Sequence, residues 1–370
     1  MRVALAHDWL TGMRGGEKVL EAICNLYPDA PLYTLVRVTG SVSAAIEAHP
    51  IHTSWVQHLP SAGRFYPHYL PLFPTAVESF DLDGFDLVIS SSHCAVKGVV
   101  PRGGAVHICY CHSPMRYAWD QFDAYFGPDQ VGNIRSRLLR PVMAWLARWD
   151  AATAGRVDRF VANSQYVAGR IRRYYNRAST VVYPPVDTDF FQPAADGAQV
   201  ASVLVVSALV PYKRLDLAIG AARLTNVPLR IVGQGPEEAR LRRVAEGAPV
   251  EFLGWRSSDE IRALYQAAGA VLLPGVEDFG IVPVEAQACG TPVVALAQGG
   301  ATETIVDGVT GALVPEPSAE AFAEAITRVL GADLDAHVIR RNAERFSADV
   351  FRTAFTAAVN ETIATHGAPE

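Results

Sequence analysis

The feature that most constrains the fold is a repeated alternation of short apolar runs with longer amphipathic segments. The first half contains the runs VALAHDW, DLVISSS, HICYCH and RFVANS, and the second half contains SVLVVSAL, LRIVG, VEFLGW, AVLLPG and PVVAL. Runs of this length, followed by Gly, Ser or Asn and then by a helical pattern, are typical of buried parallel strands in βαβ units. We therefore expect an α/β fold built on parallel sheets.

A segment rich in Pro, Gly and Asp, VVYPPVDTDFFQPAADGAQ, interrupts this alternation before the strand pattern restarts at Val203. At 370 residues the chain is long enough for about two domains. We expect a first Rossmann-like domain over residues 1–190 and a second over residues 191–350, facing each other across a cleft. The C-terminal segment, about 351–370, is expected to form a helix that packs back on the first domain.

The composition is that of a globular protein, with half of the residues hydrophobic and 19% charged. No window approaches the ~20 consecutive apolar residues of a membrane-spanning helix. The N-terminal run is broken by His7 and Asp8, so it is interpreted as a buried strand and not as a signal peptide. We expect a cytoplasmic protein whose five cysteines are reduced core residues, because their spacing forms no zinc site.

Positive charge is concentrated in one region of an acidic chain. The formal net charge is −6, yet residues 135–177 contain ten arginines against Asp150 and Asp158. The stretch NIRSRLLRPVMAWLARW mixes Arg with Leu, Met and Trp at helical spacing, a pattern of helices on anionic membranes and also of helices with an apolar core face. Pro141 is expected to break this helix. We therefore expect the Arg135–Arg177 region to contact an anionic membrane surface peripherally, at the inner face of the plasma membrane. Nucleic acid is not expected as a partner, since no recognition module accompanies the charge.

Two glutamates, Glu277 and Glu285, lie in the otherwise largely apolar stretch PGVEDFGIVPVEAQACGTPVVAL. Pro283 has no backbone N–H and is best tolerated in the first turn of a helix, so a helix should begin near Ile281 or Val282. It should end at the Gly and Pro of the following CGTP. The glutamates are therefore placed on either side of a helix start.

The sequence EDFG before this helix is expected to be a loop in which Gly280 permits close approach of a ligand. The unpaired N–H groups of a helix start, together with the positive end of the helix dipole, suit a phosphate. A ligand with hydroxyls at both ends and negative charge between them would then fit the two glutamates. A nucleotide sugar has that layout.

The E-x7-E arrangement from Glu277 to Glu285 resembles the signature of retaining glycosyltransferases of family 4, which have the GT-B fold. Further matching motifs run in order along nearly the whole chain: HDWLTGMRGGEKVLE (7–21), YCHSPMRYAWD (110–120), VANSQYVAGRI (161–171), YPPVD (183–187), PYKRLD (211–216) and GQGPE (233–237). The first, second and fifth of these are most similar to bacterial mannosyltransferases that assemble O-antigen and exopolysaccharide repeat units.

The resemblance implies retaining transfer of a hexose, mannose from GDP-mannose, to a hydroxyl of a lipid-linked glycan. Three alternatives stay open: the same fold with a UDP-sugar, a sugar-nucleotide epimerase or glycan phosphorylase, and a non-catalytic protein that binds sugar nucleotides. A glycosidase is disfavoured because the two glutamates point to opposite ends of one nucleotide, not across one scissile bond. A nicotinamide enzyme is disfavoured because no G-x-G-x-x-G follows the first strand.

The resemblance also assigns roles to single positions. His112, Lys213 and Glu277 are the expected catalytic side chains, with His112 near the donor sugar and the attacking hydroxyl, Lys213 on the diphosphate and Glu277 on the sugar hydroxyls. Glu285 is expected to bind the ribose hydroxyls. The full set of expected donor-binding residues is Gly15, Gly16, Lys213, Arg214, Glu277, Phe279, Gly280, Ile281, Val282 and Glu285.

One position departs from the family pattern. Relatives usually carry Arg five or six residues before the diphosphate Lys, where this chain has Ala208 and Ser207, and Arg214 is the candidate substitute. The base is expected to bind near residues 252–256. No cofactor and no metal are expected, because the triplets Asp81–Asp83 and Asp187–Asp189 fit turns.

Overall fold

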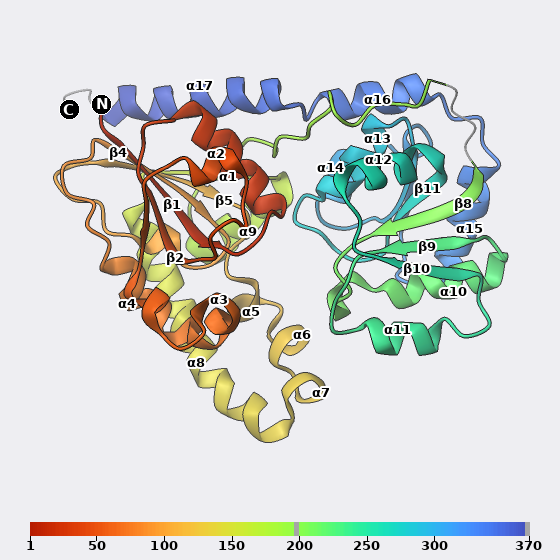
Figure 1. Ribbon diagram of the computed structural model, residues 1–370, viewed down its shortest axis with the longest axis horizontal. Coiled ribbons are helices and arrows are strands. Elements are labelled where there is room, and N and C mark those ends of the chain that lie inside the picture. The colour runs from red at the N-terminus through yellow and green to blue at the C-terminus, as the bar shows by residue number, and fades with distance from the viewer. Residues whose placement is uncertain (196–199, 367–370) are drawn as a thin grey trace. The chain divides into compact units, whose positions relative to one another are not determined.

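The computed structural model describes residues 1–195 and 200–366 and contains two sheets whose strands are all parallel (Figure 1). Within those residues the first sheet has seven strands in the order β3-β2-β1-β4-β5-β6-β7, and the second has six in the order β10-β9-β8-β11-β12-β13. The chain divides into two compact units, Met1–Pro185 with the chain from Phe351 onward, and Val186–Val350. The predicted α/β class with two Rossmann-like sheets is confirmed.

The strands of the first unit are β1 Val3–Leu10, β2 Leu32–Arg37, β3 Ile51–Thr53, β4 Leu87–Ser92, β5 Val106–Cys111, β6 Arg159–Ala162 and β7 Ser179–Val181. Its helices are α1 Gly15–Leu26, α2 Ala44–Glu47, α3 Ala62–Phe65, α4 Phe73–Glu78, α5 Arg116–Trp119, α6 Phe122–Phe126, α7 Pro128–Val131, α8 Asn133–Thr153 and α9 Gln165–Tyr175.

The strands of the second unit are β8 Val200–Val206, β9 Leu229–Val232, β10 Val250–Gly254, β11 Ala268–Leu273, β12 Val293–Leu296 and β13 Gly311–Val314. Its helices are α10 Leu215–Thr225, α11 Glu238–Val244, α12 Ser258–Ala267, α13 Ile281–Ala288, α14 Ala301–Thr304, α15 Ala319–Leu330 and α16 Ala336–Glu344, and α17 Ala348–His366 follows at the C-terminus.

The first unit buries both faces of its sheet, because successive side chains of a strand point to opposite faces. Leu5 and Ile89 pack with residues of α1 and α17 on one face, whereas Ala6 and Val88 pack with residues of α4 and α8 on the other. His7 continues the series of Leu5 in β1, so it lies at the end of the face that α1 covers.

The C-terminal helix α17 is part of the first unit's core. Phe351 and Phe355 pack edge-on against the ring of Tyr110 in β5, and all three side chains are buried. Arg159 at the start of β6 forms an ion pair with Glu361 of the same helix. The chain from Phe351 to His366 therefore completes the layer that α1 begins.

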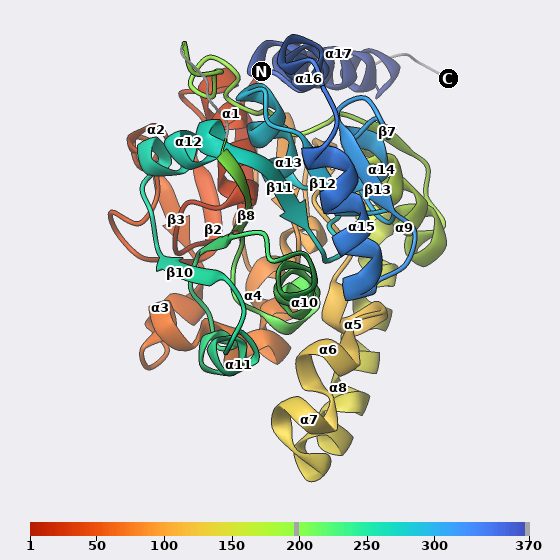
Figure 2. The same ribbon diagram turned by 90° about the vertical axis from the view of Figure 1, so that its right-hand side faces the viewer.

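The second unit has a core of the same kind. Ile219 of α10 and Phe322 of α15 pack with Ile231 of β9 and Leu272 of β11. Figure 2 shows α10 and α15 on one side of this sheet and α12 and α13 on the other. Because the strands are parallel, they all end at the same edge of the sheet, and the loop with Glu277 begins there, after β11.

Several smaller predictions are settled by the structure. All five cysteines are buried and free, as expected. The Asp81 side chain accepts the N–H of Asp83 at 3.2 Å and the Asp187 side chain accepts the N–H of Phe190 at 2.8 Å, so both triplets are turns. The strand that was expected from Val203 begins at Val200. Residues 196–199 of the Pro/Gly-rich segment and residues 367–370 of the expected C-terminal helix lie outside the described residues.

The prediction that Pro141 breaks its helix is wrong. Helix α8 runs without interruption from Asn133 to Thr153 and contains Pro141 in its interior. Pro141 costs one backbone hydrogen bond, about 3 kcal/mol in a helix interior. Burial of Met143 and Leu146 in the adjacent core offsets that cost.

Candidate active site

The loop and helix start predicted from Pro283 are present in the second unit. Helix α13 begins at Ile281 and ends at Ala288, with Gly280 at its N-cap. Gly280 has a φ of +86°, a conformation that L side chains rarely adopt. The N–H groups of Ile281 and Val282 are in the first turn, where no helix carbonyl can pair with them. This loop and helix start can accept a phosphate.

Lys213 and Glu277 lie together in front of this helix. Their side chains form an ion pair, and both are mostly buried. The contact depends on Gly275, because a Cβ atom at that position would lie 2.5 Å from the carbonyl oxygen of Tyr212 and 2.7 Å from the Cα of Lys213. Glycine therefore allows the short 3-10 helix Pro211–Lys213 to pack against the loop that carries Glu277.

Gly299 and Gly300 fix the backbone of the same loop. The N–H of Gly300 donates to the carbonyl of Glu277 at 2.9 Å, and Glu277 pairs with Gly299 in an isolated parallel bridge. A Cβ atom at Gly300 would lie 2.3 Å from the Cα of Phe279. Residues 299–300 therefore support the loop before α13. The sequence reasoning did not identify them, although the dipeptide GG could have indicated a close backbone approach.

Glu285 lies in the second turn of α13 and is buried. The hydroxyl of Tyr265, in α12, donates to its Oε2 at 3.1 Å. A buried carboxylate needs such donors, and Tyr265 supplies one while leaving further acceptor sites on the two oxygens. Burial and then the charge of Glu285 raise the pKa of Tyr265 well above its ordinary value, so this phenol stays protonated and remains a donor.

Arg214 does not join the Lys213–Glu277 pair in this structure. Its guanidinium contacts the carboxylate of Asp216, with Nε 3.2 Å from Oδ1 and an Nη atom 3.2 Å from Oδ2. Its backbone is left-handed, with a φ of +51°. The place of the missing arginine, at Ser207 and Ala208, directly follows strand β8. Arg214 therefore does not act as a second cation beside Lys213 in this structure.

The base-binding region expected near residues 252–256 is the end of strand β10. Phe252 is half-buried, with the guanidinium of Arg242 4.6 Å from its ring centre, and Trp255 follows the strand with 69% of its surface exposed. The end of β10 therefore presents an exposed aromatic side chain, Trp255.

The first unit holds a separate cluster around His112. The Oγ of Ser91 lies 3.1 Å from Nδ1 of His7 and 2.8 Å from Nε2 of His112, so one hydroxyl bridges the two imidazoles. Ser91 lies near the end of β4, His7 is its partner in the neighbouring β1, and His112 directly follows β5. The three parallel strands therefore place them at one edge of the sheet.

Gly16, in the first turn of α1, lies against the same two histidines. A Cβ atom built on it would be 3.8 Å from Nε2 of His112 and 3.8 Å from Cε1 of His7. Gly15 opens the helix. The start of α1 thus lies beside the imidazoles, and the structure brings Gly16 and His112 together.

A buried carboxylate, Asp8, organises the neighbouring loop. Its two oxygens accept the backbone N–H groups of His93, Cys94, Ala95 and Val96 at 2.6–3.0 Å. The Nδ1 of His93 lies 3.3 Å from the same carboxylate. Asp8 satisfies four donors at once, which explains why a buried strand contains an acidic residue.

Glu17 completes this cluster. Its Oε1 lies 3.8 Å from Nε2 of His7, which is beyond hydrogen-bond length, and that Nε2 has no hydrogen-bond partner among residues 1–195 and 200–366. Burial would raise the pKa of Glu17, but His7 and the charge of His93 outweigh it, so the pKa lies below its ordinary value. Glu17 is therefore an anion beside His7.

The pKa of His112 lies well below its ordinary value. Burial is the main cause, and the nearby His93, His7 and Arg116 add to it by repelling a further positive charge. His112 is accordingly a neutral imidazole at pH 7. A neutral ring can both donate and accept a hydrogen bond, which a cationic ring cannot.

The predicted residues therefore fall into two groups, one in each unit. The second unit holds Glu277, Phe279, Gly280, Ile281, Val282 and Glu285 on α13 and its preceding loop, and Lys213 reaches Glu277 from the 3-10 helix Pro211–Lys213. The first unit holds Gly15, Gly16 and His112. The sequence reasoning did not single out His7, Asp8, Glu17, Ser91 or Tyr265, although the first three stand inside a quoted motif. Nor does the described part of the chain group three His, Cys, Asp or Glu side chains as a metal site.

Two family models match the chain. One, described as glycosyl transferases group 1, matches residues 187–346, and the other, described as Glycosyltransferase Family 4, matches residues 15–190. D-inositol 3-phosphate glycosyltransferase from Mycolicibacterium smegmatis is 36% identical over 197 residues, which are 47% of this chain and 45% of that protein. The chain thus aligns with about half the length of the curated relatives it matches. The names of these relatives do not mention mannose.

Solved structures match the whole fold. Anabaena Alr3699/HepE in complex with UDP gives a TM-score of 0.72 at 21% identity, covering 98% of this chain and 100% of that one. Sucrose-phosphate synthase from Thermosynechococcus elongatus gives 0.72 at 18% identity, covering 99% and 100%. The expected GT-B architecture is confirmed by these similarities.

Proposed function

We propose that this chain, which belongs to family 4 of the glycosyltransferases, moves a hexose from a nucleotide sugar to a glycan hydroxyl with retention of anomeric configuration. The observation that carries the proposal is the Lys213–Glu277 ion pair beside the start of α13. A cation and free N–H groups at one point suit a diphosphate, and an adjacent carboxylate suits the hydroxyls of the attached sugar.

The proposed chemistry stabilises the leaving group. As the bond between the sugar and the diphosphate breaks, negative charge accumulates on the phosphate oxygens. Lys213 and the N–H groups of Ile281 and Val282 are fixed before that charge develops, which lowers the barrier without reorganisation of the site. When the donor binds, Lys213 exchanges Glu277 for the diphosphate, so the cation is in place before the bond breaks, and the released carboxylate accepts hydrogen bonds from the sugar.

Glu285 is proposed to hold the ribose. Its position one turn beyond the phosphate-binding N–H groups matches a ligand with a diphosphate between two hydroxyl-bearing rings. Tyr265 acts as a positioning residue, because its hydroxyl fixes one carboxylate oxygen. The ribose diol is proposed to donate to the same carboxylate.

His112 is proposed to contact the donor sugar and the attacking hydroxyl. A neutral imidazole can serve both as donor and as acceptor there. Ser91 orients the ring through Nε2. The same hydroxyl contacts His7, and Glu17 lies next to His7. No side chain is assigned as a covalent nucleophile, so we propose attack of the acceptor hydroxyl on the face from which the diphosphate leaves.

For the substrates we propose GDP-mannose as donor and a lipid-linked glycan of cell-surface polysaccharide assembly as acceptor, which rests on the motif resemblance. The similar solved structures include complexes with UDP and UDP-glucose, so a UDP-sugar is the competing donor. The sugar and the acceptor are separate claims from the transferase activity and are tested separately.

The experiment is a thermal-shift screen of the purified chain with GDP-, UDP- and ADP-sugars, followed by measurement of nucleoside diphosphate release with and without acceptor glycan. Ligands that bind only the folded state raise the melting temperature. Release that needs an acceptor supports transfer. Release of sugar 1-phosphate from the glycan when inorganic phosphate is added indicates a phosphorylase. An isomerised donor indicates an epimerase, and a thermal shift without any turnover indicates a binding protein.

The binding-protein alternative has a specific observation in its favour. The family's usual arginine is replaced at Ser207 and Ala208, and Arg214 is engaged with Asp216. A site with Lys213 as its one assigned cation binds a diphosphate more weakly and stabilises the leaving group less. Turnover of the Ala208→Arg variant above that of the wild type would show this deficit directly.

A further inference from the structure

The first half of helix α8 carries an exposed apolar stripe. Ile134, Leu138, Pro141 and Trp145 are spaced by four, three and four residues, so they lie on one face of the helix. Ile134, Leu138 and Trp145 have 79%, 67% and 45% of their surface exposed, and Pro141 is exposed as well. A row of large apolar side chains of this length on a surface helix marks an interaction site.

Arginines border this stripe. Arg135, Arg137 and Arg148 are exposed and form no ion pair with the residues that the structure describes. The helix has no acidic residue before Asp150. In the neighbouring helices, Asp123 of α6 is paired with Arg140, and Asp129 lies in the first turn of α7. The stripe therefore combines apolar side chains with unneutralised positive charge.

Four other arginines of the Arg135–Arg177 region are used inside the unit, whereas Arg172 and Arg173 are exposed on α9. Arg156 pairs with Glu78, Arg159 with Glu361, and the buried Arg170 with Asp120, while Arg177 donates to the carbonyls of Ala154 and Val157. The local count of ten arginines in the sequence thus overstates the basic surface. Besides Arg172 and Arg173 on α9, the arginines of this region that remain exposed without an acidic partner among the described residues are those of α8.

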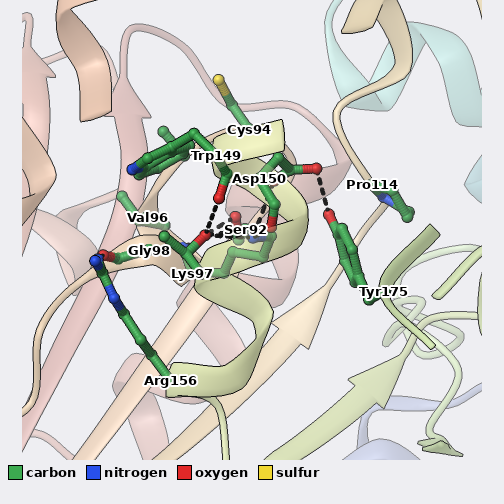
Figure 3. A network of polar contacts seen from close by, with 12 residues as sticks. Ser92, Cys94, Val96, Lys97, Gly98, Pro114, Trp149, Asp150, Arg156 and Tyr175 are labelled. Atoms are coloured by element: carbon green, nitrogen blue, oxygen red, sulfur yellow. Dashed lines mark hydrogen bonds and ion pairs between the residues drawn. The ribbon is translucent and has the colours of Figure 1, made fainter. Parts of the chain in front are cut away.

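The second half of α8 anchors this surface rigidly. Figure 3 shows Lys97 reaching Asp150, with its ammonium 3.0 Å from the carboxylate and 2.9 Å from the hydroxyl of Thr153. The Asp150 carboxylate also accepts from Tyr175 at 2.8 Å. Lys97 directly follows the residues 93–96 whose N–H groups Asp8 holds. The helix is therefore fixed to the loop that carries His93.

We propose that the exposed face of α8, defined by Ile134, Leu138, Pro141 and Trp145 with Arg135, Arg137 and Arg148, docks on the surface of an anionic lipid bilayer. The apolar side chains enter the interface while the guanidinium groups contact lipid phosphates. Exposed guanidinium groups beside exposed apolar side chains complement both the charge and the apolar interior of an anionic bilayer surface. The helices within residues 1–195 and 200–366 are too short or too polar to span a bilayer, so the contact is lateral.

This inference rests on the proposed function in one respect. A lipid-linked acceptor presents its glycan within reach of a bilayer, and a unit docked through α8 holds the loop of His93 and the site of His112 in a fixed relation to that surface. The docking itself stands on the exposed side chains and their charge alone.

The test is flotation of the full chain with vesicles of phosphatidylcholine alone and of phosphatidylcholine with about 30% phosphatidylglycerol. We expect binding to the anionic vesicles at least tenfold above the neutral ones and its loss in 1 M NaCl, because each basic residue near such a surface contributes about fivefold in affinity. Arg137→Glu/Arg148→Glu and Ile134→Ser/Leu138→Ser should each reduce binding at least tenfold. The matched controls Arg328→Glu and Leu224→Ser, which alter exposed residues of the second unit, should leave it unchanged.

Three results would overturn the proposal: no binding to anionic vesicles, binding that the α8 variants do not change, or a wild-type dimer in solution that the α8 variants convert to monomer. The last would assign the stripe to a second copy of the chain. Thermal shifts with nucleotide sugars, measured on the same α8 variants, separate this proposal from the transferase. Variants that keep the donor-induced shift and lose vesicle binding support membrane docking. If no nucleotide sugar stabilises the chain, the proposed transferase function is refuted, and the vesicle result still stands.

Discussion

Lys213 and Glu277 form an ion pair in which both side chains are mostly buried. The pair places the cation expected at the diphosphate in contact with the carboxylate expected at the sugar. Lys213→Ala should lower kcat about 10²–10³-fold, the usual effect of removing one preorganised group that stabilises transition-state charge. Steady-state kinetics check this, with Arg328→Ala as a matched control outside the site. Equal kcat values in the Lys213 variant and the wild type would refute the role of the cation.

Ser91 is predicted to position His112. Ser91→Ala removes the hydrogen bonds to His7 and to His112, and we expect kcat to fall roughly tenfold, the equivalent of one hydrogen bond of about 1.4 kcal/mol. Ser90→Ala is the matched control, because Ser90 is equally buried in the same strand but bonds to His107 on the opposite face at 2.8 Å. Both variants lose stability. If Ser90→Ala lowers kcat as much as Ser91→Ala, the effect is structural and the assignment fails.

Tyr265 is predicted to affect donor binding through Glu285. Tyr265→Phe keeps the ring and removes the donor to the carboxylate, so KM for the donor should rise about tenfold with kcat nearly unchanged. Tyr175→Phe, which removes a buried tyrosine hydroxyl from Asp150, serves as control for general destabilisation. A fall in kcat without a change in KM would contradict a positioning role at the ribose.

The sequence predicted much of this second-unit site because its signals are local. Pro283 identifies the start of α13, and the apolar runs identify the central strands. Strands β2, β3, β7 and β13 were not among the expected runs. The edge strands β3 and β7 have only three residues each, and pairing with a neighbour creates them without an extended apolar run. The partners Ser91 of His112 and Tyr265 of Glu285 lie 21 and 20 residues away in the chain, so only the folded topology shows them.

Helix α8 is another place where the sequence alone was not sufficient. Helical spacing could not tell which of its apolar residues enter the core, and the structure divides them: Met143 and Leu146 are buried, whereas Ile134 and Leu138 are exposed. Pro141 has the φ angle of a helix and lies on the exposed side, so it loses a hydrogen bond without clashing with the core. A rule about single residues predicted a break that tertiary packing prevents.

The buried pair Lys97–Asp150 is predicted to matter for stability. Lys97→Met leaves the Asp150 carboxylate without its cation, which should lower the free energy of unfolding by about 3–5 kcal/mol. Urea denaturation measures the change. The double variant Lys97→Met/Asp150→Leu should recover most of that loss, because it removes the stranded charge. A double variant that is less stable than Lys97→Met would contradict this account.

His107 should make stability depend on pH. Burial lowers its pKa to about 4 from an ordinary value of 6.5. The unfolded chain therefore binds a proton between these values that the folded chain does not, and stability is lost as the pH falls below 6.5. In His107→Gln the loss of unfolding free energy between pH 7.5 and pH 5.0 should be smaller than in the wild type by about 2 kcal/mol. The exposed His58→Gln is the control, and an equal loss in His107→Gln and the wild type would contradict the shift.

The central claim is that the start of α13 binds a nucleotide sugar, and calorimetric titration of the most stabilising donor tests it most directly. Wild-type protein should bind with one site, Glu285→Ala should bind at least tenfold more weakly through loss of its hydrogen bonds to the ribose, and Glu320→Ala, an exposed glutamate on α15, should bind as the wild type does. Unchanged affinity in both Glu285→Ala and Lys213→Ala would contradict the claim.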